Sequence, residues 1–191
     1  METMWYAAPD SLDAAFYFAA EEYLTTRFSK EGRVLLLWRT EPGVMLGVNQ
    51  AAEAEVDLAE AERLGVSLTR RSSGGGAIFT DPGTLLFTVI LPFRIGEDDA
   101  KRLEREYVAG PIVRVLNQMG VPARCEGRND ITVDGKKVSG LAQYARGGRL
   151  CTHGSLLYDA DLDTLARVLR PDAQKTASKS VRSVRARVAN L

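Results

Sequence analysis

The sequence predicts an α+β domain in which helices flank sheets whose strands are joined largely by hairpins. The chain has 191 residues, of which 45% are hydrophobic and 26% are charged, an ordinary composition for one domain with a substantial core. Apolar runs of strand length alternate with stretches of helical periodicity. Turn sequences such as Glu41-Pro42-Gly43 and Asp134-Gly135 separate several of these runs, which favours antiparallel pairing. We expect a single domain over residues 1–191.

Charge and cysteine content exclude several classes of protein. The 25 basic and 25 acidic residues balance, so no overall field attracts nucleic acid or a membrane surface. Two cysteines, Cys125 and Cys151, and one histidine, His153, are too few for a zinc site of the usual spacing or a disulfide framework. No apolar run is long enough to span a bilayer, and residues 1–5 carry no basic segment before an apolar one. We therefore expect a cytoplasmic protein without nucleic-acid or membrane partners.

The first helix is predicted to begin at a cap on Asp10 or Ser11 and to run to about Phe28. Apolar side chains recur on it at helical spacing and should face a sheet. These side chains are Leu12, Phe16, Ala19 and Tyr23.

Shorter elements follow this helix. Residues 34–38 and 44–48 are two apolar runs on either side of the Glu41-Pro42-Gly43 turn, which predicts a hairpin. Asp57 should cap a short helix that Gly65 ends.

The middle of the chain contains the longest helical pattern. A strand is expected over residues 85–91, after the Asp81-Pro82-Gly83 turn. The helical pattern then covers residues 97–119 and stops at Gly120. Gly110-Pro111 inside it predicts a break or kink.

The C-terminal part begins at a turn in residues 146–148, which leads into a strand over residues 150–158. A helix over residues 161–169 should be capped by Asp159 or Asp161. The remaining residues, 171–191, form a basic segment. Its charged side chains are Lys175, Lys179, Arg182, Arg185 and Arg187 against Asp172 alone.

An arginine pair followed by three glycines forms the most unusual stretch, Arg70-Arg71-Ser72-Ser73-Gly74-Gly75-Gly76. It connects an apolar run at residues 66–68 with another at residues 77–79, so the glycines fall between two strands. Glycine permits positive φ and close backbone approach, and consecutive free amides can bind an anion. A flexible hairpin loop is the simpler interpretation. A P-loop and a dinucleotide-binding fingerprint are excluded, because neither Gly-Lys-Ser/Thr nor a helical pattern follows.

The Asp134-Gly135 turn predicts a two-residue hairpin loop in which Thr132 faces Lys137 and Asp130 faces Ser139. Side chains alternate across a sheet, so the two faces differ. One face should carry Asp130, Thr132, Lys137 and Ser139, and the core face Ile131, Val133 and Val138. The carboxylate and the lysine become diagonal neighbours. A solvated polar face is the alternative interpretation.

Five motifs follow one another from the glycine-rich loop to the last residue. They are Arg70-Arg71-Ser72-Ser73-Gly74-Gly75-Gly76-Ala77-Ile78-Phe79, Gly127-Arg128-Asn129-Asp130, Lys136-Lys137-Val138-Ser139-Gly140, His153-Gly154-Ser155-Leu156-Leu157 and Ser183-Val184-Arg185-Ala186-Arg187-Val188-Ala189-Asn190-Leu191. In this order and spacing the chain resembles the lipoate–protein ligases. The resemblance extends from the first helix to the end, and the five motifs together are far more specific than any one of them.

The resemblance implies a mixed α/β catalytic domain with the fold of biotin/lipoate–protein ligases, related more distantly to class II aminoacyl-tRNA synthetases. Members of the family activate lipoate with ATP and magnesium to lipoyl-adenylate and release pyrophosphate. They then transfer the lipoyl group to a lysine of a lipoyl domain. The implied acceptors are the E2 subunits of 2-oxoacid dehydrogenases, the glycine cleavage H protein or a similar lipoyl carrier.

Site residues carry over from the family at matching positions. Lys137 would be catalytic, reaching both the lipoate carboxyl and the α-phosphate, and Asp130 would help to hold Mg²⁺. The implied ATP- or adenylate-binding residues are Arg71, Gly76, Ala77, Ile78, Phe79, Lys137, His153 and Ser155. The implied lipoate-binding residues are Arg70, Ser73, Gly74, Gly75, Gly76, Lys137, Ser139 and Gly140.

The chemistry explains why a lysine is needed at this position. A carboxylate that attacks a phosphate is repelled by it, so a fixed cation that contacts both lowers the barrier. The acyl chain needs an apolar slot. We expect the lining to come from Val44, Leu46 and Val48, or from Leu85 and Phe87.

The chain departs from the family pattern in two places. Family ligases often continue past the Arg-Val-x-Asn-Leu motif into an accessory domain, whereas this sequence stops at Leu191. We therefore expect a catalytic domain alone, either truncated or assisted by a separate accessory subunit, with residues 171–191 as a hinge or docking segment. Thr80 and Thr84 stand where relatives often have histidine and asparagine.

Two other functions stay open. An octanoyltransferase of the same superfamily would use a cysteine nucleophile, Cys125 or less directly Cys151, and octanoyl acyl carrier protein without ATP. The intact Gly127-Arg128-Asn129-Asp130 motif favours the ligase instead. A catalytically incomplete subunit that only binds lipoate is the other alternative. Lys137 argues against it, because a binding protein has less need of a cation at the reacting carboxyl.

Overall fold

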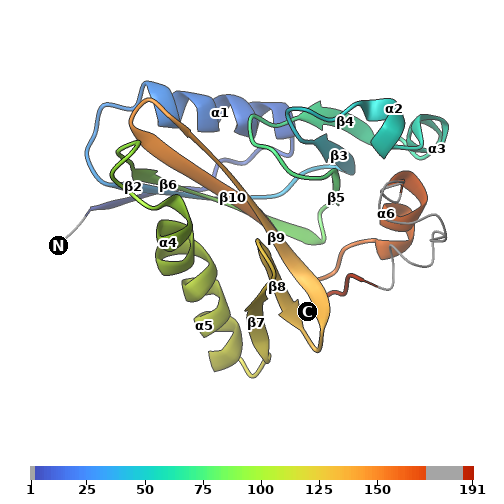
Figure 1. The fold of residues 1–191 in the computed structure, drawn as a ribbon. Coiled ribbons are helices and arrows are strands. Elements are labelled where there is room, and N and C mark those ends of the chain that lie inside the picture. Colours follow the sequence, from blue (N-terminus) through green and yellow to red (C-terminus); the bar gives the residue numbers. More distant parts are fainter. Residues whose placement is uncertain (1–2, 171–186) are drawn as a thin grey trace.

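Two sheets form the framework of the computed structural model, which describes residues 3–170 and 187–191 (Figure 1). The larger sheet has seven strands in the order β1-β2-β6-β10-β9-β8-β7, and the smaller has the order β4-β3-β5. Among the strands of the described residues, the β1–β2 and β3–β4 pairs are parallel and the other pairs are antiparallel, so the mixed, largely antiparallel fold class is confirmed. In chain order the strands are β1 Met4–Ala7, β2 Arg33–Trp38, β3 Gly43–Leu46, β4 Ser67–Arg70, β5 Ile78–Thr80, β6 Thr84–Pro92, β7 Ala123–Glu126, β8 Asp130–Val133, β9 Lys136–Arg146 and β10 Arg149–Leu157.

Helices cover both faces of the larger sheet (Figure 1). The helix α1 packs on one face, and the continuous run α4-η1-α5, in which η1 is a π-helix, packs on the other. The helices α2, α3 and α6 lie beside the smaller sheet. Their bounds are α1 Ala14–Thr26, α2 Ala52–Glu55, α3 Leu58–Arg63, α4 Ala100–Glu104, η1 Arg105–Ala109, α5 Gly110–Gln118 and α6 Leu162–Val168.

Strand β6 shows how one strand supplies both cores. Leu86 and Ile90 pack toward α1, whereas Phe87 and Val89 pack toward η1. This division follows from the period-two alternation of side chains along a strand. Because both faces of β6 are covered, its sequence is apolar almost throughout.

The inward face of α1 differs from the prediction. The helix begins after Asp13, whose carboxylate accepts a hydrogen bond from the amide of Ala15 at 2.8 Å. The buried residues are Ala14, Tyr17, Glu21 and Thr25, while Leu12, Phe16, Ala19 and Tyr23 are exposed. Apolar residues occur around the whole helix, so periodicity alone could not select the face. Tyr17 decides it, because its ring stacks on Trp38 with the ring centroids 4.5 Å apart.

The predicted hairpin of residues 34–38 and 44–48 is wrong. Strand β2 pairs with β1 and β6 in the larger sheet, and β3 pairs with β4 and β5 in the smaller one. The Glu41-Pro42-Gly43 turn therefore carries the chain from one sheet to the other. Gly43 packs closely there, since a Cβ on it would lie 2.7 Å from Oγ of Ser67 and would displace that hydroxyl.

The residues predicted to begin and end the other helices are mostly confirmed. Asp57 caps α3 and Gly65 follows that helix with a φ of 67°. The long helical pattern begins later than predicted, at Ala100 after its cap Asp99, and its expected break is the π-helix η1 immediately before Gly110. Asp161 caps α6.

The C-terminal basic segment lies mostly outside the described residues, since residues 171–186 are not described. Residues 187–191 are described and lie against β9 and the end of β10. In the described part of the chain no helix is both long and apolar enough to cross a membrane.

Candidate active site

The β8–β9 hairpin places a lysine and a carboxylate side by side. Asp134 and Gly135 adopt φ angles of 50° and 74°, and Thr132 pairs with Lys137 as predicted. Beyond this pair a bulge shifts the register, so that Asp130 pairs with Gly140 instead of Ser139. The ammonium of Lys137 lies 2.7 Å from a carboxylate oxygen of Asp130, which confirms the predicted diagonal pair.

The bulge also moves Ser139 away from the predicted polar face. Ser139 pairs directly with Ile131 on one side and with Leu156 on the other, and paired residues share a face of the sheet. Both neighbours pack in the cluster under α5. Ser139 therefore lies on the core face, and its buried hydroxyl makes no hydrogen bond within the described structure. The expected common face of Ser139 and Lys137 is wrong for this reason.

Gly140 leaves room for the Lys137 side chain. A Cβ at Gly140 would lie 2.8 Å from Nζ and 2.9 Å from Cε of Lys137. The aliphatic end of the lysine therefore crosses directly over the glycine backbone. Asp130 and Gly140 together fix the position of the ammonium.

Arg71 organises the glycine-rich loop from inside. Its Nε donates to Oγ of Ser73 at 3.0 Å, and its NH2 group donates to the carbonyls of Gly74 and Gly76 at 2.9 and 2.7 Å. Its NH1 group donates to the carbonyl of Met45 at 2.8 Å. Burial lowers the pKa of this guanidinium, and the charge of Glu21 opposes that shift. Arg71 thus connects the glycine-rich loop to β3 through these hydrogen bonds.

Arg70 has a different role from its neighbour. Its NH1 group donates to the carbonyls of Gly47 and Gln50 at 2.8 and 2.7 Å, outside the cavity. These bonds hold the 47–50 loop beside the glycine-rich loop. The two loops touch so closely that a Cβ on Gly47 would lie 2.3 Å from the carbonyl oxygen of Gly75.

A buried chain of hydrogen bonds connects α1 to the glycine-rich loop through His153. The carboxylate of Glu21 lies 2.9 Å from Nδ1 of His153, and Nε2 of the ring lies 2.6 Å from Oγ of Ser73. Glu21 also accepts from the hydroxyl of Thr88 at 2.5 Å, which in turn accepts from Nε1 of Trp38 at 3.1 Å. A carboxylate only accepts, so Nδ1 carries a proton in this bond. Glu21 also balances the charge of buried Arg71.

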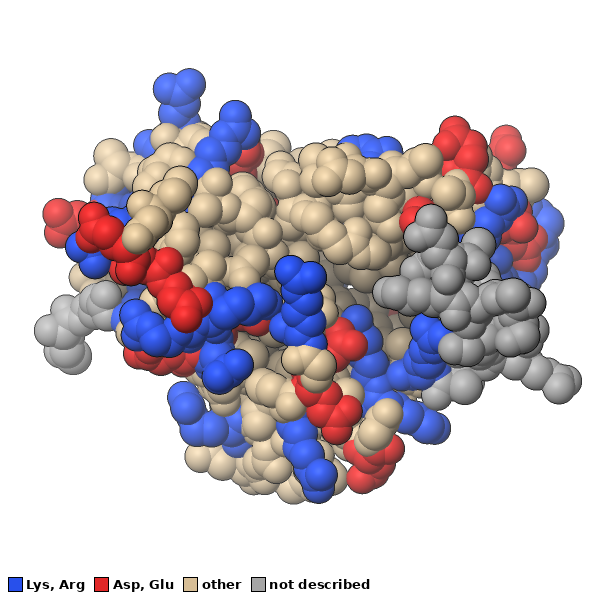
Figure 2. Space-filling view, viewed as in Figure 1, with Lys and Arg blue, Asp and Glu red and all other residues tan. Residues whose placement is uncertain are grey.

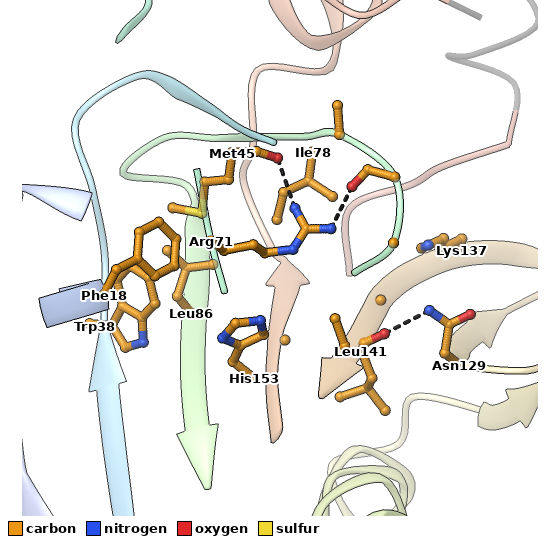
Figure 3. Close-up of a pocket in the computed structure, with 16 residues that line it drawn as sticks. Phe18, Trp38, Met45, Arg71, Ile78, Leu86, Asn129, Lys137, Leu141 and His153 are labelled. Carbon is orange, nitrogen blue, oxygen red and sulfur yellow. Dashed lines mark hydrogen bonds between the residues drawn. The ribbon is translucent and has the colours of Figure 1, made fainter. Parts of the chain in front are cut away.

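A narrow cavity of about 120 Å³ opens between β10, β9 and the glycine-rich loop (Figure 3). Its aromatic and aliphatic end is formed by Phe18, Trp38, Met45 and Leu86, and Lys137 and Asn129 lie at the opposite end. The remaining lining residues are Arg71, Gly75, Gly76, Ala77, Ile78, Gly140, Leu141, Ala142, His153 and Gly154. The cavity suits a slender apolar molecule with a polar group near Lys137.

A wider cleft of about 590 Å³ begins where the narrow cavity ends. Lys137 and residues 76–78 line both spaces, so the ammonium stands at the junction. The cleft is further lined by Glu55, Phe79, Glu126, Gly127, Asp130, Thr132, Gly135, Ser155, Leu157, Leu165, Leu169, Arg170, Arg187 and Val188. Figure 2 shows charged side chains of both signs around a hollow on this face, as a balanced net charge implies.

The structure brings most of the predicted site residues to these two spaces. Gly75, Gly140, Arg71 and His153 line the narrow cavity, and Phe79, Asp130 and Ser155 line the cleft. Residues 76–78 and Lys137 line both. In the described part of the chain Arg70, Ser73, Gly74 and Ser139 line neither space. Ser73 is fully buried behind the loop, bonded to His153.

The prediction of the apolar lining chose the wrong face of two strands. Val44 and Leu46 pack toward α6, and Phe87 packs toward η1. Their neighbours Met45 and Leu86 line the cavity instead. Because almost every residue in each run is apolar, alternation gives little sign of which face is which. Sequence reasoning also missed Phe18, Trp38, Asn129 and Leu141 as lining residues.

Three carboxylates line the cleft, and of these Asp130 contacts Lys137 at the junction with the cavity. Asp130 offers hard oxygen ligands at the junction, and Mg²⁺ commonly binds one or two carboxylates together with substrate phosphates and water. The residues present therefore fit a phosphate-bound ion. The group of three ligand-type side chains found among the described residues lies elsewhere, at buried Glu21, Cys151 and His153.

The two cysteines lie away from the reacting end. Cys125 is exposed on β7, and among the described lining residues it belongs to neither space. Cys151 is fully buried beside Tyr144, and burial raises the pKa of its thiol well above the usual value. The raised pKa keeps the Cys151 thiol protonated, which does not favour it as a nucleophile.

The fold and the site together define an α+β domain in which an apolar cavity meets a polar cleft at a lysine. The chain belongs to the family described as the lipoyl protein ligase A/B catalytic domain, which matches residues 13–191.

Individual relatives and solved structures are consistent with this membership. A probable lipoate-protein ligase A of Mycoplasma pneumoniae is 43% identical over 180 residues, covering 92% of this chain and 52% of the relative. A bi-partite lipoate protein ligase of Thermoplasma acidophilum, described with its E2 lipoyl domain, matches all of this chain and 74% of that chain with a TM-score of 0.83 and 29% identity. The chain spans about half the length of the curated relatives it matches.

Two further solved structures carry ligands. A lipoate protein ligase of Thermoplasma acidophilum with bound lipoic acid and a lipoate-protein ligase A bound with ATP each match with a TM-score of 0.81 and 28% identity. Each match covers all of this chain and 76% of the other chain.

Proposed function

We propose that this chain is the catalytic domain of an ATP-dependent lipoate–protein ligase. The observation that carries the proposal is the position of Lys137, which lines both the narrow apolar cavity and the wider cleft. Lipoate would lie in the cavity with its dithiolane toward Trp38, and ATP would lie in the cleft. Similar solved structures with bound lipoic acid and with bound ATP support the binding of both ligands.

In the first step a carboxylate oxygen of lipoate attacks the α-phosphorus of ATP, and pyrophosphate leaves. The two reacting groups are both anionic, so the Lys137 ammonium between them reduces their repulsion and stabilises the charge of the transition state. The amides of residues 76–78, which border both spaces, would donate to the same oxygens. Arg71 keeps that loop in place through its bonds to Gly74 and Gly76.

In the second step the amine of an acceptor lysine attacks the acyl carbonyl of lipoyl-AMP, and AMP leaves. The Lys137 ammonium would polarise that carbonyl. Asp130 would hold a magnesium ion, which would supply positive charge against the phosphates. The apolar cavity would hold the acyl chain in one orientation through both steps.

The acceptors proposed here are the lipoyl domains of 2-oxoacid dehydrogenase E2 subunits, the glycine cleavage H protein or a similar carrier. A neighbouring structure that was described with its E2 lipoyl domain supports this choice. That ligase is bi-partite, which supports the proposal that a separate accessory chain assists this one through residues 171–191. We propose that the enzyme works in the cytoplasm.

The test is formation of pyrophosphate from ATP in the presence of lipoate, with and without an accessory chain. Lys137→Ala should abolish it, because no other cation lines both spaces in the described structure. Lys136→Ala is the matched control, because Lys136 is the exposed neighbour on the same strand. Lys137→Ala with the rate of the unaltered chain would refute the proposal, as would pyrophosphate release that does not depend on lipoate.

A further inference from the structure

The C-terminal segment, residues 187–191, lies along the strand that carries Lys137. The amide of Lys137 donates to the carbonyl of Arg187 at 2.8 Å, and the amide of Ala189 donates to the carbonyl of Lys137 at 3.0 Å. Lys137 and Val188 thus form a parallel bridge. Figure 1 shows this end of the chain beside β9, near the β8–β9 hairpin. Both backbone groups of Lys137 are bonded to the C-terminal segment.

This contact occurs at the end of β9 that is not paired with β10. The last β10–β9 pair joins Leu156 to Ser139, and Lys137 lies two residues farther toward the hairpin turn. The stretch between contains the bulge that follows the Thr132–Lys137 pair. A short strand end with one free edge, next to a bulge and a turn, opens easily. The C-terminal segment occupies that edge.

The side chain of Asn190 anchors the segment. Its Oδ1 accepts from the amide of Ala160 at 3.1 Å, and its Nδ2 donates to the carbonyl of the same residue at 3.0 Å. The amide of Leu191 adds a bond to the carbonyl of Leu157 at 3.0 Å. Only a side-chain amide offers a donor and an acceptor in this arrangement, so neither Asp nor Ala can replace Asn190 fully.

We propose that Asn190 is a positioning residue of the ligase reaction proposed above. It fixes the C-terminal segment to Ala160, and the segment fixes the backbone of Lys137 on the side opposite β8. The ammonium is then held from two directions, by the backbone bridge and by Asp130. A catalytic group displaced by about 1 Å can lose on the order of a hundredfold in rate, so this support matters for adenylate formation.

A merely structural role of Asn190 predicts a different result. Asn190 lines neither the narrow cavity nor the cleft in the described structure, and the apolar end at Trp38 lies at the far end of the cavity from Lys137. Loss of the anchor should therefore lower kcat for adenylate formation by a larger factor than it weakens lipoate binding, because the apolar end of the cavity is undisturbed. General loosening of the fold would lower kcat and lipoate affinity to a similar extent.

The experiment compares Asn190→Ala with Leu191→Ala in the full chain. Leu191→Ala is the matched control, because it removes an apolar side chain from the same segment and keeps the backbone bond to Leu157. Residue-resolved amide hydrogen exchange reports on the bridge, and lipoate binding and lipoate-dependent pyrophosphate release report on the reaction. We expect Asn190→Ala to speed exchange of the Lys137 amide, to lower kcat at least about tenfold and to weaken lipoate binding by a smaller factor.

Unchanged exchange at Lys137 in Asn190→Ala would overturn the proposal, and so would an equal loss of activity in Leu191→Ala. If the unaltered chain forms no adenylate even with an accessory chain, the proposed function fails. The exchange of the Lys137 amide then still decides whether Asn190 holds this strand. If Asn190→Ala does not fold, Asn190→Asp serves instead, because it keeps the side-chain volume and the acceptor but loses the donor. The same outcomes are expected.

Discussion

The ammonium of Lys137 lies 2.8 Å from the place that a Cβ of Gly140 would occupy, so the lysine reaches the junction of cavity and cleft only because residue 140 has no side chain. The carboxylate of Asp130 holds the same ammonium at 2.7 Å. Asp130 pairs with Gly140 across the β8–β9 bulge, so one irregularity in the sheet brings all three residues together. The bulge is therefore part of the site.

Gly140→Ala should impair the reaction while leaving the fold nearly intact. The new Cβ meets the flexible end of the Lys137 side chain rather than backbone, so the ammonium can move aside, and we expect a change of less than about 1 kcal/mol in the free energy of unfolding. Adenylate formation should fall by on the order of ten- to a hundredfold. Urea unfolding and pyrophosphate release measure the two effects.

A double-mutant comparison makes that prediction specific. If Gly140→Ala acts by moving the ammonium, it should have no further effect in a Lys137→Ala background. Because Lys137→Ala alone should abolish activity, the comparison is made on lipoate affinity, and an additional loss of affinity in the double variant would show that the methyl group acts elsewhere in the cavity.

Local signals in the sequence predicted the parts of the fold that depend on neighbouring residues. The caps at Asp57 and Asp161 and the turn at Asp134-Gly135 each involve a few consecutive residues, and the structure contains all three. The Asp130–Lys137 pair could be predicted because it follows from that turn. The bulge beside it carries no signal of its own, and for this reason Ser139 was placed on the wrong face.

Long-range pairing could not be read from the sequence. Nothing in the runs of β2 and β3 shows that they join different sheets, because both are apolar and separated by an ordinary turn. In β3 every residue is buried, so Val44 and Met45 look alike although only Met45 lines the cavity. The residues of a cavity with two apolar walls become known only when the sheets are assembled.

Ala142→Leu should block the narrow cavity without affecting the cleft. Ala142 lines only the cavity, so a larger side chain there takes space from the acyl chain. We expect lipoate affinity to fall by about tenfold or more, since single methylene groups in apolar pockets are worth on the order of 1–3 kcal/mol. ATP affinity should stay unchanged. Calorimetric titration of each ligand measures both values.

Ala145→Leu is the matched control for this change, because it lies on the same strand at an exposed position. It should bind lipoate like the unaltered chain. Equal weakening of lipoate and ATP in Ala142→Leu would contradict the assignment of the two ligands to separate spaces.

Glu21→Gln should destabilise the protein through the buried hydrogen-bond chain. The carboxylate accepts from both Thr88 and His153, and an amide nitrogen would face one of these donors. The charge that balances buried Arg71 would also be lost. We expect a decrease of about 1–3 kcal/mol in the free energy of unfolding, measured with urea.

Glu22→Gln provides the comparison on the next residue. Its carboxylate lies on the surface, 2.7 Å from the guanidinium of Arg146, and both side chains are more than a third exposed. Exposed pairs contribute about 0–1 kcal/mol, so this variant should be close to the unaltered chain. Similar losses in the two variants would mean that the buried chain adds little to stability.

Thiol labelling should distinguish the two cysteines and test the octanoyltransferase alternative. Cys125 is exposed and should react with a disulfide reagent in the folded protein. Cys151 should react only after unfolding, because burial excludes the reagent and raises the thiol pKa, so the protonated and unreactive form persists as pH rises through the ordinary cysteine range. Counting modified thiols at pH 7 and pH 9, with and without denaturant, measures the reactivity of each cysteine.

Cys125→Ser should keep lipoate- and ATP-dependent transfer, since Cys125 lies outside both ligand spaces in the described structure. Loss of transfer in Cys125→Ser, together with activity on an octanoyl carrier protein in the absence of ATP, would require a covalent acyl-cysteine mechanism in place of the lysine-centred one.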